Sequence, residues 1–188
     1  RTLPDSPCDA LVTGWANPPS AGDEDTHPGT SAESYPLSAI LTDARRLPRD
    51  LLRGHVLAVS LAGFALDVEY LGDGDEARGQ HRPARRFADG GWIQPLGGIE
   101  DPGGCVDLQL RIARLDTLTN PLTRADVAVV TADVPGRPLS LLTSPWQLDG
   151  EQLPTPRVGA WIRGTFLLTG RIAGGLPSAT EHLGRAFG

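Results

Sequence analysis

The segment at 73–92 contains the densest run of side chains that could bind a charged partner. It opens with three carboxylates and continues with basic residues, followed by Phe87. Arginine binds phosphate or carboxylate through two parallel hydrogen bonds, and an aromatic ring stacks on a base or packs against a protein. The plainer interpretation is a solvated loop whose acidic and basic halves neutralise each other. The candidate partner-binding residues in this segment are Arg82, Arg85, Arg86 and Trp92.

Trp161 is a further candidate for a partner contact. It lies on a predicted strand, on the face opposite Val158, Ala160 and Ile162. Tryptophan often anchors a protein interface, and it is just as common in a protein core. The sequence leaves both interpretations of Trp161 open.

Three carboxylates on predicted strands suggest an alternative, catalytic chemistry. Asp67 and Glu69 lie two residues apart, so both project from one strand face, and Asp107 lies on the polar face of another strand. Paired carboxylates act as general acid and base or hold a divalent ion. The wet face of a half-buried strand has the same pattern. We assign no catalytic residue and keep a spatially assembled carboxylate site as the alternative.

No metal or cofactor motif is complete. Residues 73–76 resemble the start of a calcium loop, but position 78 is Arg rather than Gly and position 84 is Ala rather than Glu. The four histidines have no ligand spacing, and Cys8 and Cys105 are too far apart for a C-x-x-C site. We therefore assign no metal and no cofactor. Cys105 is expected to be a packing residue, and two free thiols favour a reducing, cytoplasmic location.

Composition limits the class of partner. The net charge is −6 and all seventeen basic residues are Arg, which argues against a protein whose main task is to grip nucleic acid. No apolar run reaches the roughly 18 residues that a membrane-spanning helix needs. The chain contains no Met, so an upstream segment is expected. Another protein is the favoured partner.

Hydrophobic patterning predicts mainly strands. Alternation of apolar and polar residues, or runs of Val, Ile and Leu, predict strands at 56–61, 66–70, 106–112, 126–134, 139–143 and 158–172. Asn120 and Pro121 mark a turn. A short helical turn is expected at 47–53. The spacing of Ser178 and Glu181 matches a capping box and predicts a short C-terminal helix.

The strand order predicts a small antiparallel barrel. Residues 1–36 are rich in proline and are expected to form an extended, irregular arm, and 37–188 a single β-rich domain. Within that domain, 72–104 is expected to be a long Gly/Pro-rich loop. The order of strands from 106 to 172 resembles an oligonucleotide/oligosaccharide-binding (OB-like) barrel, with a loop in place of the usual helix.

These observations favour a non-catalytic binding or assembly module that contacts another protein through its arm and its long loop. An enzyme with a carboxylate site is the alternative. Single-stranded nucleic-acid binding through the arginines near Trp92 is a second alternative, which the acidic net charge opposes.

Overall fold

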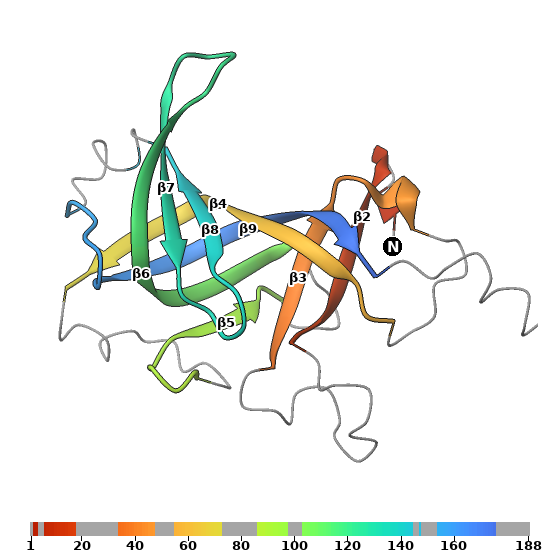
Figure 1. Ribbon diagram of the computed structural model, residues 1–188, viewed down its shortest axis with the longest axis horizontal. Helices are drawn as coiled ribbons and strands as arrows, with labels where there is room; N and C mark the ends of the chain where they lie inside the picture. Colours follow the sequence, from red (N-terminus) through yellow and green to blue (C-terminus); the bar gives the residue numbers. More distant parts are fainter. Residues whose placement is uncertain are drawn as a thin grey trace, which may run out of the picture.

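The protein is mainly β, and its described strands form one sheet (Figure 1). The computed structural model describes residues 2–3, 6–17, 34–47, 55–72, 86–97, 103–144, 147 and 154–175. Within them lie one 3-10 turn, η1 (Ala44–Arg46), and nine strands: β1 (Thr2–Leu3), β2 (Ser6–Ala16), β3 (Tyr35–Leu41), β4 (Ala58–Leu71), β5 (Trp92–Pro95), β6 (Cys105–Thr119), β7 (Asp126–Ala132), β8 (Leu139–Thr143) and β9 (Trp161–Gly174).

Five of these strands pair around a closed ring. β4 pairs with β9, β9 with β6, β6 with β7, β7 with β8, and β8 returns to β4. The β4–β8 and β3–β9 pairings are parallel, whereas the remaining pairings are antiparallel. The expected wholly antiparallel arrangement is therefore corrected to a mixed sheet. Distant chain segments meet in the two parallel pairs, and hydrophobic alternation gives no sign of which strands those will be.

β6 closes the ring because it is long enough to pair with both of its ring neighbours, β9 and β7. Its first half, 105–111, pairs with β9, and its second half, 112–119, pairs with β7. The register shifts between Ile112 and Arg114, and such an irregularity bends a strand and increases its twist. The second half then extends with β7 as a hairpin that rises above the ring in Figure 1.

The core lies inside the ring and follows the two-residue period of the strands. Alternate apolar residues of β6 and β9 point inward and are fully or almost fully buried. Removing such side chains from water stabilises the fold by about 25 cal/mol per Å² of apolar surface. The largest of these buried residues are Phe166, Leu108, Leu110, Ile112, Ile162 and Leu168, and Leu141 of β8 is buried with them.

The arm expected to be irregular, 1–36, contains β1, β2 and the first two residues of β3. β2 pairs with β3 from Ala10–Leu41 to Ala16–Tyr35, and β3 joins the ring through β9. Val12 and Leu37 pack against the core, which offsets the entropy cost of ordering the segment. Pro36 is tolerated because it lies near the start of a strand. Residues 18–33 lie outside the described residues.

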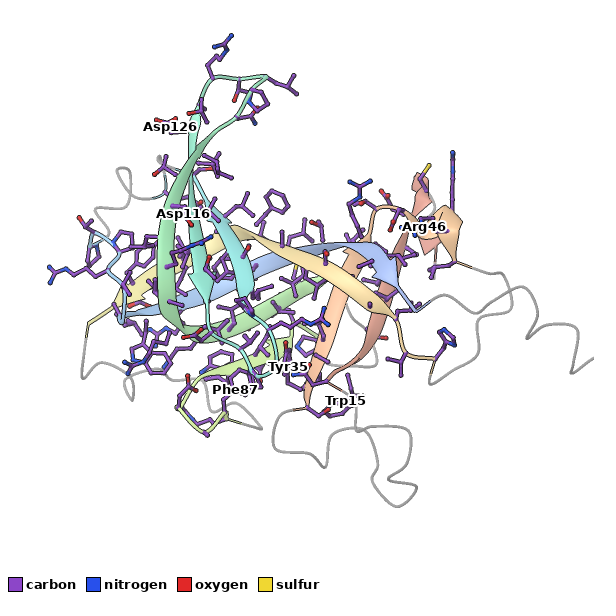
Figure 2. The ribbon with its side chains drawn as sticks, in the orientation of Figure 1. Trp15, Tyr35, Arg46, Phe87, Asp116 and Asp126 are labelled. Atoms are coloured by element: carbon purple, nitrogen blue, oxygen red, sulfur yellow. The ribbon has the colours of Figure 1, made fainter. Side chains whose placement is uncertain are left out.

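The expected loop at 72–104 also contains a strand. β5 pairs with β6, placing Trp92 opposite Gln109, and a turn precedes it at 87–90. Phe87 stacks edge-on against Tyr35 of β3, with ring centroids 5.4 Å apart, and Figure 2 shows the pair below the ring. Burial raises the pKa of Tyr35 to about 12. Four-residue strands such as β5 are too short to produce a readable alternation.

The helical predictions lie mostly outside the described residues. This is true of the C-terminal helix expected from Ser178 and of the expected turn at 47–53 after its first residue. The turn η1 was not predicted. Asp43 precedes it and accepts the Ile172 backbone N–H at 3.0 Å, while Arg46 donates to the Ile172 carbonyl at 2.5 Å. These contacts tie η1 (Arg46 is labelled in Figure 2) to the end of β9.

Replacing Asp43 by Asn should make stability less dependent on pH. Partial burial raises the pKa of Asp43, but the Ile172 N–H and the Arg46 guanidinium outweigh it and hold the pKa below its ordinary 3.8. A depressed pKa contributes stability above the unfolded-state pKa, and this contribution is lost as the pH falls through the folded-state pKa. Thermal unfolding should therefore show Asp43→Asn less stable than wild type at pH 7 and equal to it at the lowest pH. Asp126→Asn is the control, and a constant difference across pH would contradict the assignment.

Replacing Gly164 by Ala should disrupt the β4–β9 pair. Gly164 lies opposite Val68 beside an irregularity in β4, with φ +152°, and a Cβ there would lie 2.1 Å from the Asp67 carbonyl oxygen. We expect Gly164→Ala to lower the free energy of unfolding by about 3 kcal/mol or more. Gly14→Ala, whose Cβ meets nothing within 4 Å, should change it by less than about 0.5 kcal/mol. Urea unfolding measures both.

Candidate functional surface

Of the three predicted partner-binding arginines, only Arg86 lies within the described residues. Arg82 and Arg85 lie outside the described residues. Arg86 is exposed, and its Nη1 donates to the Gly90 carbonyl at 3.1 Å, so it closes the turn that precedes β5. Arg86 therefore has a local structural contact in addition to its exposed position.

Trp92 and Trp161 are interior residues, only 3% and 1% exposed. The Arg111 guanidinium lies over the Trp161 ring, 5.1 Å from its centroid, and Gly90 approaches the edge of the same ring. Cation–π contacts of this kind hold a surface arginine over a buried ring. Of the two interpretations of Trp161, the structure therefore supports the core. Neither tryptophan is placed to anchor a partner on the surface.

The three candidate carboxylates share one outer face of neighbouring strands. Along β4, β9 and β6, the register places Asp67 beside Thr165 and Thr165 beside Asp107. Thr165 Oγ1 donates to Asp107 at 2.6 Å. Asp67 and Asp107 are thus two strand spacings, about 10 Å, apart, which is too wide for both carboxylates to act directly on one atom.

Glu69 forms an ion pair rather than a catalytic partnership. One of its oxygens accepts from Arg163 Nε at 3.2 Å and Nη2 at 2.5 Å. The third nitrogen, Nη1, is buried and has no hydrogen-bond partner among the described residues. Arg163 therefore depends on Glu69 for the neutralisation of its charge.

The remaining reactive groups give no sign of a catalytic or metal centre. Burial raises the pKa of the Cys105 thiol, and the nearby Asp107 raises it further, which suits a packing residue rather than a nucleophile. Cys8 and Cys105 are both free thiols. Among the residues that the structure describes, no three metal-ligating side chains are grouped. Within the same residues, no helix is long and apolar enough to cross a bilayer.

An apolar patch covers the outer face of the sheet from β4 to β6. The register places Phe64 beside Leu142, Leu142 beside Val129, and Val129 beside Asp116. Two residues further along, Val127 pairs with Leu118. Phe64 is 44% exposed, and Leu66 and Leu118 are more so. We call this surface the outer patch, and its members are Phe64, Leu66, Leu118, Val127, Val129 and Leu142.

A structured hairpin tip extends the outer patch beyond the ring. Asn120 Oδ1 accepts from the backbone N–H groups of Leu122 and Thr123, and the Asn120 carbonyl accepts from Arg124. Leu122 is 92% exposed. In Figure 2, Asp116 marks the base of this hairpin and Asp126 its upper stem. The tip thus presents a large apolar side chain on a backbone that is already ordered.

Sequence patterning identified the strands of the outer patch but not the patch itself. Phe64 and Leu66 belong to a nearly continuous apolar run, so periodicity does not tell their outward side chains from the buried ones. The signal available was the turn at Asn120 and Pro121, which is followed directly by Leu122 and then by polar residues. It predicts a turn but not how far the hairpin projects.

Replacing Glu69 by Gln should destabilise the fold by about 1 kcal/mol, because the partly buried Arg163 would lose its counter-charge. Asp133→Asn provides the control, since Asp133 is exposed and has no ion pair among the described residues. It should change the free energy of unfolding by less than about 0.5 kcal/mol. Urea unfolding at low and high salt measures the effect, and equal values for the two variants would contradict it.

Comparisons of the chain with protein-family models, with curated proteins and with solved structures found no match. The function of the outer patch is therefore inferred from its own residues and their placement.

Proposed function

We propose that the protein is a non-catalytic binding or assembly module and that its partner is another protein. The observation that supports this proposal is the outer patch, where apolar side chains of four neighbouring strands face away from the core. A contiguous exposed apolar surface marks an interaction site more often than scattered exposed residues do. The partner would cover Phe64, Leu142 and Val129 at its centre.

The proposed architecture is an OB-like barrel with a rearranged strand order. In the ring, β6, β7, β8 and β9 take the places of its first four strands, and β4, which comes earlier in the chain, takes the fifth. OB-like barrels bind their ligands on the face of the second and third strands and on the loop between the first and second. Those positions correspond here to the β7–β8 face and the hairpin tip at Leu122. Fold analogy thus indicates the same surface as the exposed apolar residues.

The chemistry of the outer patch favours a protein over a nucleic acid. A single-strand binding surface combines stacking rings with a basic groove. Here Phe64 is the one aromatic member of the patch, and the nearby Arg114 is paired with Asp116 at 2.7 Å. The net charge of −6 adds a general repulsion toward phosphate.

The proposal relocates the contact from the arm and the long loop. In the described part of the arm, Val12 of β2 packs on the core, and in the described part of the loop Trp92 is buried, so these described parts contribute to the fold. The catalytic alternative gains no support from the carboxylates. Glu69 is paired with Arg163 and Asp107 is hydrogen-bonded to Thr165.

Photo-crosslinking tests the proposal without knowledge of the partner. A photoreactive phenylalanine analogue placed at Leu142 should give a discrete protein adduct in an extract of the native cells. The matched control is the same analogue at Val158, which is 63% exposed and lies outside the outer patch. Adding Phe64→Asp should reduce the Leu142 adduct at least about fivefold, because a charge is then buried at the contact. No adduct, or equal adducts from both positions, would overturn the proposal.

A further inference from the structure

Two charged residues at opposite ends of the apolar surface have no side-chain partner within the part of the chain that the structure describes. Arg124 lies at the hairpin tip, next but one to the exposed Leu122, and its hydrogen bond is made by the backbone. Asp67 is exposed on β4, directly after Leu66. Among the described residues, neither side chain forms an ion pair or a hydrogen bond. At each end of the surface, an exposed leucine therefore lies close in the chain to one charged residue without a partner among the described residues. The two charges are of opposite sign.

This arrangement is self-complementary. In a twofold interface the same surface is used by both copies, so a residue i that contacts j is matched by j contacting i. An axis near the stem pair Leu118 and Val127 would bring the tip of each hairpin onto β4 of the other copy. Leu122 would then meet Phe64 and Leu66, and Arg124 would meet Asp67.

We propose that the occupant of the outer patch is a second copy of this chain, joined by reciprocal contact of each hairpin tip with β4 of its mate. The inference rests on the proposed function, since it names the partner for the same surface. The ordered tip favours such a contact because little conformational freedom remains to be lost on binding. The Arg124–Asp67 pair fixes the register and occurs twice in each dimer.

Sedimentation equilibrium of the purified chain tests the inference with charge-swapped variants. Wild type should show a reversible monomer–dimer equilibrium. Arg124→Asp and Asp67→Arg should each raise the dissociation constant about tenfold or more, since each places like charges together twice per dimer. The double variant should return to within about threefold of wild type. Circular dichroism confirms that each variant is folded.

Two leucine substitutions distinguish a specific contact of the hairpin tip from the general effect of removing an exposed apolar side chain. Leu122→Ser should weaken the dimer, whereas Leu96→Ser, at a 45% exposed position on the turn after β5, should not. A monomer at every concentration, or a double variant without rescue, would overturn the inference. If the chain is monomeric and Leu142 still crosslinks to a different protein, the proposed function stands and this inference fails. If Leu142 gives no adduct at all, both fail.

Discussion

The closure of the ring depends on β9, which is paired along both of its edges. On one edge it follows β4 from Trp161 to Gly174, and on the other it pairs first with β6 and then with β3. The β9 backbone hydrogen bonds therefore connect β3, and through it β2, with the ring. The approach of β4 at Gly164 leaves no room for a side chain. A strand in this position tolerates little change. A shift of its register by one residue would turn its inward side chains outward and would disturb its pairing with the neighbours on both edges.

The ring has two outer surfaces of different character. Where β4, β9 and β6 run side by side, several outward polar residues are paired with one another, as in Glu69 with Arg163 and Thr165 with Asp107, whereas Asp67 is exposed. Where β4, β8 and β7 run side by side, Phe64, Leu142 and Val129 form an apolar row that faces away from the core, next to the polar pair Ser140 and Thr131. Because most of its charged groups are paired with one another, the first surface is the weaker candidate for a binding site. The second surface has no such compensation within the described residues.

The sequence predicted the ring strands better than it predicted their partners. The alternation in 106–112 and the apolar run in 126–134 have a local cause, because each side chain faces either the core or the solvent. Both predicted strands are present, as parts of β6 and β7. The pairing of β4 with β8 depends instead on ring closure, which no local pattern encodes. β2 was taken for part of an irregular arm because proline recurs throughout 1–36, although Val12 packs on the core. The candidate site was the weakest prediction. Trp92 and Trp161 have the residue type of an interface anchor, and the fold uses them as core.

The hairpin tip separates the residues that hold its shape from those that it displays. Its backbone is fixed by Asn120 and by the hydroxyl of Thr123, which accepts from the Ala125 N–H. The side chains of Leu122 and Arg124 have no part in those hydrogen bonds. Arg124 has a left-handed backbone (φ 60°), which β-branched residues adopt poorly, so its replacements are restricted. Leu122 carries no such restriction, so the apolar side chain that a partner meets can diversify during evolution while the fold stays constant.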